Sequence, residues 1–187
     1  MILILMFLCL SVQGQNFDTE VKYPDNQGNN ILIQNSFPRG GFSYTDPEGS
    51  DHVYVVFWTR ITNQRDGTIE MRIDFPADRY RLIQSFDRSF RLFLPKNKMT
   101  LDKEPLFLYG LSDLESVLDE GFYSSSSIRS DIKPKDSHLF YVVALFNKGV
   151  EGVVRAGFSL KDQKLIFTIN GTDIPCGEMK VKSSNSQ

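Results

Sequence analysis

The feature that most constrains the fold is a run of β-branched and aromatic residues at His52–Thr62, HVYVVFWTRIT. Residues of these types favour the pleated, half-buried surface of a sheet. Apolar residues occupy neighbouring positions in this run, so both faces of an extended segment would be apolar. We therefore expect a central strand that is covered on both sides.

The next segment, Thr68–Phe75, has the pattern of a strand with one face in solvent. Its apolar residues are Ile69, Met71, Ile73 and Phe75, and they alternate with Glu70, Arg72 and Asp74. The intervening Asp66-Gly67 has the composition of a tight turn. The two segments are thus predicted to form a β-hairpin.

The rest of the chain shows many short strands and one helix. Further strands are expected at 31–33, 42–44, 80–83, 90–94, 106–109, 127–132, 138–146, 152–160 and 164–170, the last two as a hairpin. A helix is expected at Leu111–Glu120, with Ser112 and Glu115 at the spacing of a capping box. Strands do not alternate with helices, so the pattern predicts an all-β fold, an antiparallel β-sandwich or jelly-roll-like domain with one short helix.

The N-terminal residues have the pattern of a secretory leader. Met1–Leu10 is almost wholly apolar, and the next four residues have small residues at the two positions that a signal peptidase reads, so we place the cleavage after Gly14. The run is shorter than the roughly 20 residues of a membrane-spanning helix, so no transmembrane segment is expected. A lipid anchor on Cys9 is the alternative. The prediction is a secreted or periplasmic protein with a signal peptide at 1–14, one domain at 15–179 and a disordered tail at 180–187, after an irregular start at 15–30.

Composition excludes several classes of function. The net charge of −2 and the pI of about 5.7 give no attraction to nucleic acid. The only histidines are His52 and His138, and no zinc, phosphate-loop or nucleophile-elbow motif is present. No cofactor is expected. Cys176 is the only cysteine after Gly14, and burial as a small apolar residue is the favoured interpretation.

One candidate metal site lies in the turn Asp46–Asp51. Asp46, Glu48 and Asp51 supply the oxygen ligands that Ca²⁺ takes, and Gly49 permits a sharp bend. The spacing is not that of an EF-hand, and the alternative is a solvated turn without metal.

Two other groups are candidate ligand-binding residues. Four arginines, Arg79, Arg81, Arg88 and Arg91, alternate with aromatic residues and would clamp an anion or a sugar. The alternative is an outward strand face. Tyr54 and Trp58 share one face of their strand and would stack on a sugar, although burial of Trp58 in the core is the favoured interpretation.

These observations favour an exported, non-catalytic domain that binds a protein, a cell-surface component or a glycan. One alternative is a carboxylate-based hydrolase of polysaccharide or peptidoglycan that uses an acidic pair such as Asp102 with Glu104 or Asp119 with Glu120. Another is a structural subunit assembled by strand pairing, for which an uncovered apolar edge strand would be the sign. The step from fold to function is an analogy, so the site must decide.

Overall fold

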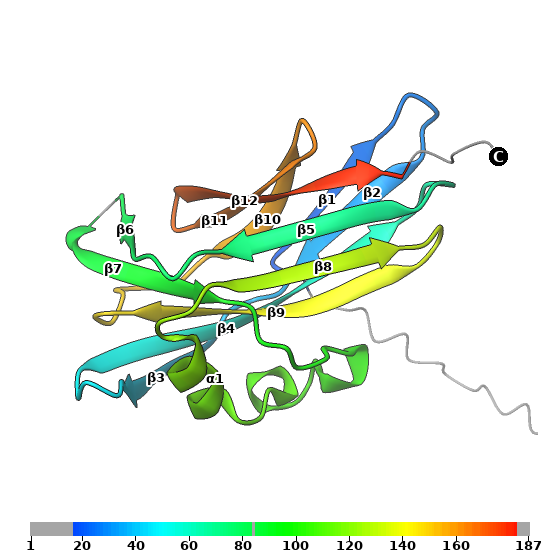
Figure 1. The fold of residues 1–187 in the computed structure, drawn as a ribbon. Helices are drawn as coiled ribbons and strands as arrows, with labels where there is room; N and C mark the ends of the chain where they lie inside the picture. The colour runs from blue at the N-terminus through cyan, green and yellow to red at the C-terminus, as the bar shows by residue number, and fades with distance from the viewer. Residues whose placement is uncertain (1–16, 84, 183–187) are drawn as a thin grey trace, which may run out of the picture.

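The computed structural model describes residues 17–83 and 85–182, which form two antiparallel sheets packed face to face (Figure 1). The predicted leader lies outside the described residues. The larger sheet contains β1 (Thr19–Pro24), β2 (Asn30–Asn35), β3 (Arg39–Thr45), β4 (Asp51–Asn63), β6 (Tyr80–Leu82), β7 (Ser85–Phe93) and β9 (Ser137–Phe146). The smaller sheet contains β5 (Ile69–Phe75), β8 (Ser126–Ile132), β10 (Ala156–Lys161), β11 (Lys164–Ile169) and β12 (Thr172–Val181).

The strands that are buried on both faces lie at the centre of the larger sheet. The larger sheet runs β1–β2–β4–β9–β7–β6, with β3 beside β4, and the smaller sheet runs β10–β11–β12–β5–β8. β4 and β9 lie at the centre of the larger sheet, paired from Val53–Phe146 to Thr62–Ser137. The predicted antiparallel β-sandwich is confirmed.

Two hydrophobic cores lie on opposite faces of the larger sheet. Between the sheets, Phe57 and Phe146 pack with Phe75 and Phe167 of the smaller sheet. On the other face, Val56, Trp58, Tyr141 and Val143 pack under a short helical segment. That segment contains the 3₁₀ helices η1 (Leu101–Lys103) and η2 (Phe107–Gly110) and the α-helix α1 (Leu114–Gly121). The prediction that His52–Thr62 is central and covered on both sides is confirmed.

The predicted hairpin of His52–Thr62 with Thr68–Phe75 is wrong. β4 lies in the larger sheet and β5 in the smaller one, and β5 pairs with β8 and β12 instead. The Asp66-Gly67 turn carries the chain from one sheet to the other, and the apolar face of β5 is buried in the core between the sheets. The hairpin of β10 and β11 is confirmed.

Other local predictions are also corrected. Residues 19–24, expected to be irregular, form β1, and residues 106–109, expected to be a strand, lie mostly in η2. Helix α1 begins at Leu114 after a left-handed Asp113 that makes no side-chain cap, so the capping box of Ser112 and Glu115 does not form. β12 was not expected, and it continues to Val181, two residues past the predicted domain boundary.

Asn35 at the end of β2 ties the two sheets together. Its amide donates to the carbonyl of Phe158 on β10 at 3.1 Å, and its side-chain oxygen accepts from the N–H of Phe158 at 2.9 Å. It also bonds the hydroxyls of Thr19 and Thr59. The side chain is 3% exposed, so these partners have no water to replace it.

We predict that Asn35→Ala lowers the free energy of unfolding by about 3 kcal/mol, because it leaves buried backbone groups of Phe158 without partners. Urea denaturation followed by circular dichroism measures the change. Asn30→Ala in the same strand removes one weaker bond, from Asn30 to the Gly28 carbonyl at 3.3 Å, and is the matched control. Equal losses in the two variants would contradict a special role for Asn35.

Candidate functional site

β3 is an edge strand that is open on its outer side. It runs beside the first half of β4, from Arg39 opposite Val56 to Thr45 opposite Asp51. β2 occupies the second half of the same β4 edge, and β1 covers β2 from outside. Within the described part of the chain, β4 is the only strand that pairs with β3, so the outer backbone of β3 is left for another strand.

The other edges of the larger sheet are protected. β1 presents the charged side chains of Glu20 and Lys22 and ends at Pro24. β6 is only three residues long. Charges, proline and short length all prevent a strand from pairing with an outside chain.

The edges of the smaller sheet are protected as well. β8 presents Arg129 and Asp131 to solvent, and Asp131 pairs with Lys182 at 2.6 Å. The backbone of Phe158 in β10 is already bonded to Asn35. By contrast, residues 40–45 of β3 carry neither charge nor proline.

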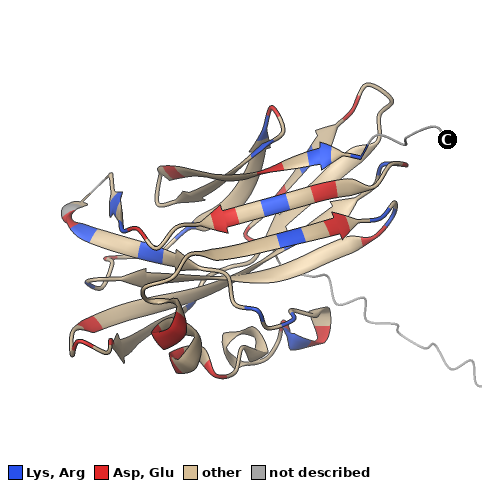
Figure 2. Ribbon diagram, viewed as in Figure 1, with Lys and Arg blue, Asp and Glu red and all other residues tan. Residues whose placement is uncertain are grey.

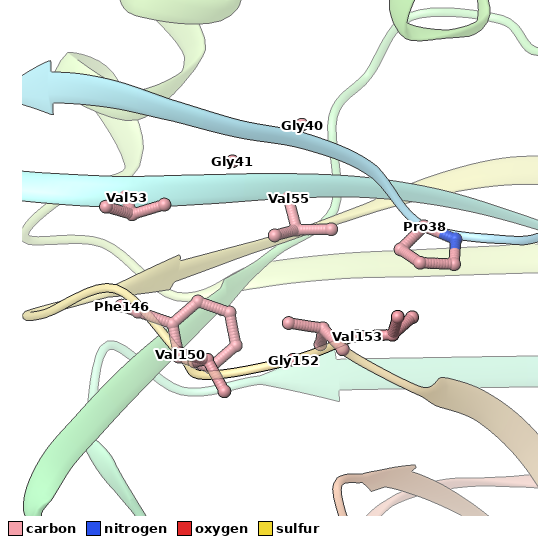
Figure 3. A pocket seen from close by; sticks show the side chains of 10 residues that line it. Pro38, Gly40, Gly41, Val53, Val55, Phe146, Val150, Gly152 and Val153 are labelled. Atoms are coloured by element: carbon pink, nitrogen blue, oxygen red, sulfur yellow. The ribbon is translucent and has the colours of Figure 1, made fainter.

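A pocket of about 200 Å³, lined by apolar side chains and by exposed backbone, opens beside β3, on the face of the larger sheet that looks toward the smaller sheet (Figure 3). Its lining residues are Pro38, Gly40, Gly41, Val53, Val55, Phe146, Val150, Gly152, Val153 and Val154. Val55, Phe146 and Val154 belong to the core between the sheets. The pocket is therefore a notch in the sandwich whose floor is the hydrophobic core.

Gly40 lets β3 approach the backbone of β4 closely beside this notch. Gly40 has a φ of 142°, and a Cβ there would lie 2.5 Å from the carbonyl oxygen of Tyr54. The strand register shifts between Gly40 and Phe42, which is a β-bulge. After the bulge, Phe42–Thr45 pairs regularly with β4, so four residues of the open edge have ordinary strand geometry.

An aromatic cluster lies on the opposite face of β3. The ring of Phe42 is 5.4 Å from that of Phe107 in η2 and 6.0 Å from that of Tyr54 in β4. Phe42 is 43% exposed and Phe107 is 72% exposed, so these large apolar rings face solvent. The open strand thus has an apolar surface on each side.

The far end of β3 is acidic (Figure 2). The β3–β4 turn contributes Asp46, Glu48 and Asp51, and α1 carries Glu115, Asp119 and Glu120. The Tyr44 hydroxyl donates to Asp119 at 2.5 Å. Burial, the bond to Asp119 and the nearby charges of Asp46 and Glu115 together raise the pKa of Tyr44. Negative charge therefore surrounds the end of the open strand.

The structure does not bring the three carboxylates of the predicted metal site together. Asp46 accepts the N–H groups of Glu48 and Ser50 and contacts the His52 ring at 2.8 Å. Glu48 accepts from Tyr123, and Asp51 accepts from Thr45. In residues 17–83 and 85–182 no three acidic, histidine or cysteine side chains are placed to hold a metal ion.

The four predicted arginines divide among three places. Arg79 and Arg91 meet His52 at a small depression on the helical face of the larger sheet, where Arg91 stacks on Phe122 at 4.2 Å. Arg88 lies elsewhere, with Glu151 at 3.3 Å, and Arg81 is exposed on β6. Burial and the charge of Arg79 lower the pKa of Arg91. The four side chains form no single clamp.

Of the predicted sugar platform, only Tyr54 reaches the surface cluster. Trp58 is fully buried and packs edge-to-face with Phe17 and Tyr109, at 5.4 and 6.2 Å. Its ring has no free face for a ligand. The sequence analysis missed Phe42 and Phe107 as ligand-binding candidates. Turn-forming residues beside Phe42 obscure its strand, and Phe107 lies 65 residues further along the chain and reaches the cluster only through η2.

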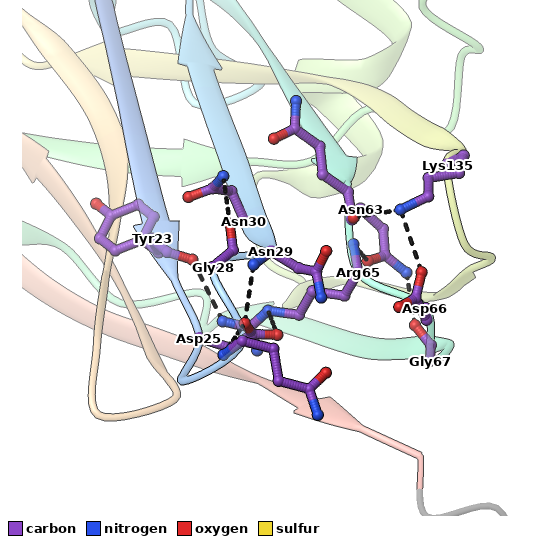
Figure 4. Close-up of polar contacts among 12 residues, drawn as sticks. Tyr23, Asp25, Gly28, Asn29, Asn30, Asn63, Arg65, Asp66, Gly67 and Lys135 are labelled. Carbon is purple, nitrogen blue, oxygen red and sulfur yellow. Dashed lines mark hydrogen bonds and ion pairs between the residues drawn. The ribbon is translucent and has the colours of Figure 1, made fainter.

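The opposite end of the sandwich is closed by polar loops (Figure 4). Asn63 donates to the carbonyls of Gly67 and Ile132 at 2.8 and 2.9 Å. Arg65 lies 3.6 Å from Asp25 and also donates to the Tyr23 carbonyl. The Asn63 amide is thus engaged by backbone groups, and Arg65 is engaged by the Tyr23 carbonyl and by Asp25.

Comparison with known protein families, curated proteins and solved structures finds no match to this chain. In the part of the chain that the structure describes, no helix combines the length and apolar character needed to cross a membrane.

The buried Asp46 side chain makes the stability of the β3–β4 turn depend on pH. The N–H of Ser50, followed by the His52 ring and the N–H of Glu48, holds the pKa of Asp46 below its usual 3.8 against the effect of burial. A lowered folded-state pKa stabilises the protein above the unfolded-state pKa, and this contribution is lost as pH falls through the folded-state value.

We predict that Asp46→Asn lowers the urea midpoint at about pH 7, and that its difference from wild type narrows near pH 3 as the wild-type carboxylate is protonated. Asp51→Asn, at an exposed position in the same turn, is the control. A deficit in Asp46→Asn that is the same at both pH values would contradict the electrostatic explanation.

Cys176 is predicted to be chemically inert in the folded protein. It is 5% exposed, its thiol lies 3.5 Å from the Leu165 carbonyl, and burial raises its pKa to about 12. Since the thiolate is the reactive form, iodoacetamide should alkylate it only after denaturation. Mass spectrometry of native and urea-treated samples measures this, and rapid native alkylation at Cys176 would show that the site opens.

Proposed function

We propose that this protein is an exported, non-catalytic binding domain that captures an extended segment of a partner protein as an added strand on β3. The leader expected at 1–14 supports export. The observation that carries the proposal is the contrast between β3 and the four protected edges, because an unprotected edge strand is a template for pairing.

Strand addition uses the backbone for affinity and the side chains for selection. Each hydrogen bond between the partner and β3 contributes about 0.5–1.5 kcal/mol net. Side chains of the added strand alternate between the two faces of the sheet. One set would meet the pocket at Gly40 and Gly41, and the other would meet the rings of Phe42 and Phe107.

The geometry favours a protein segment over a glycan. The ring planes of the aromatic cluster are inclined by 46° for Phe42 with Tyr54 and 55° for Phe42 with Phe107, so they form no flat platform. The side chains that line the pocket come from proline, valine and phenylalanine and have no hydrogen-bonding group, so sugar hydroxyls would find only backbone partners there.

Asp46 and Asp87 do not suit the role of a catalytic acid. Such an acid requires a raised pKa, whereas hydrogen bonds from Ser50 and Ser85 respectively are the main cause of lowered pKa values at Asp46 and Asp87. Asp119 is engaged by Tyr44.

The proposal is tested by selecting binders on the immobilised protein from a displayed library of linear peptides about twelve residues long, somewhat more than a typical strand. Phe42→Lys and Ser43→Lys should each weaken the selected peptides at least about tenfold, or ~1.4 kcal/mol, because a charge is placed at the open edge. Binding is measured by calorimetry, and hydrogen exchange should show protection of the Phe42–Thr45 amides.

Val21→Lys is the matched control, since Val21 is an exposed apolar residue on the edge strand β1. It should leave peptide affinity unchanged. Failure to select any peptide, or protection at another surface, would overturn the proposal. A wild-type dimer that Ser43→Lys dissociates would replace it with self-assembly, the second copy then being the occupant of β3.

A further inference from the structure

The surroundings of β3 also specify the chemistry of the captured segment. Resting on the proposed strand addition, we infer that this segment places an apolar side chain, aliphatic or phenyl, in the pocket at Gly40–Gly41 and a Lys or Arg at the acidic end of β3. The pocket and the charged end lie at opposite ends of the same open strand, so a single extended segment contacts both.

The pocket accepts one apolar side chain. Its volume of about 200 Å³ is comparable to the roughly 150 Å³ of an engineered apolar cavity that binds benzene. Because Val55 and Phe146 on its floor are core residues, a side chain that enters extends the core and leaves water. Burial of an aliphatic or phenyl group against this floor is favourable, whereas a polar side chain would lose hydrogen bonds to water.

The acidic end selects a cation. Glu48 and Asp51 are exposed at the β3–β4 turn, and Glu115 and Asp119 approach from α1. No lysine or arginine occurs between Leu111 and Ile128. Arg91 lies near the turn but is held under Phe122, to whose carbonyl it donates, so it offsets this charge only in part. A basic side chain of the partner would therefore be attracted here.

The positions of these two features fix a spacing. From Gly41 to Thr45 is four residues of β3, about 13 Å at 3.3 Å per residue. Because the pocket opens on the face toward the smaller sheet, whereas Glu115 and Asp119 lie on the helical face, the basic residue should lie an odd number of positions, about three or five, from the pocket residue. It precedes the pocket residue if the added strand is antiparallel to β3 and follows it if the strand is parallel. The selected sequences thus also report the orientation of the bound segment.

The test compares peptides selected on wild type with those selected on two altered proteins. Val150→Phe fills the pocket with a ring from its own wall. The double variant Glu48→Lys with Asp51→Lys reverses the charge of the turn. Circular dichroism establishes that both remain folded. Glu70→Lys, at an exposed acidic position on the outer face of β5, is the control for charge.

Wild type and Glu70→Lys should select an apolar residue with a Lys or Arg about three or five positions away. Val150→Phe should shift the pocket position to Gly or Ala and bind the wild-type peptides at least about tenfold more weakly. The charge-reversed turn should lose the basic residue and prefer an acidic one. Peptides that pair with Phe42–Thr45 without these preferences would overturn the inference and leave strand addition standing. Peptides that bind away from β3 would overturn both.

Discussion

Burial of both faces of β4 and β9 is the constraint on which the rest of the structure depends. Alternate residues of these strands, such as Phe57 and Trp58, enter two different cores. A sheet with two apolar faces needs a cover on each side. The smaller sheet provides one cover, and the segment that contains η1, η2 and α1 provides the other. The chain therefore forms three layers around the two central strands.

The open edge follows from how far these covers extend. Tyr109 and α1 reach the face of β3, where Tyr109 stacks under Arg39 and Asp119 accepts from Tyr44, but neither lies along its outer backbone. On the other face, the loop at 147–155 stops short and leaves the pocket. The edge of β10 differs from that of β3. There the side-chain amide of Asn35 bonds the backbone N–H and carbonyl of Phe158, which are then not available to another strand.

Sequence patterns identify where the strands lie better than they identify which strands pair with each other. The two-sided composition of His52–Thr62 predicts a central strand, since burial on both faces is a local property of the residues. The hairpin with Thr68–Phe75 fails because a turn such as Asp66-Gly67 suits both a hairpin and a crossing between sheets. Tyr54 is the one predicted ligand residue that the structure places in the aromatic cluster at β3. Phe107 joins that cluster through η2, a contact that no spacing in the chain encodes.

The position of an open edge is likewise a property of the whole sheet. Gly40-Gly41 has the composition of a turn and Phe42–Tyr44 that of a short strand, yet only the pairing of β2 and β1 beyond them reveals that β3 lacks an outer neighbour. The absence of charge at residues 40–45 matters because these residues lie at the open edge. β3 has exposed rings on one face and, on the other, a pocket that reaches the core between the sheets. A further strand would bury this apolar surface, and the free energy of that burial would drive the proposed binding.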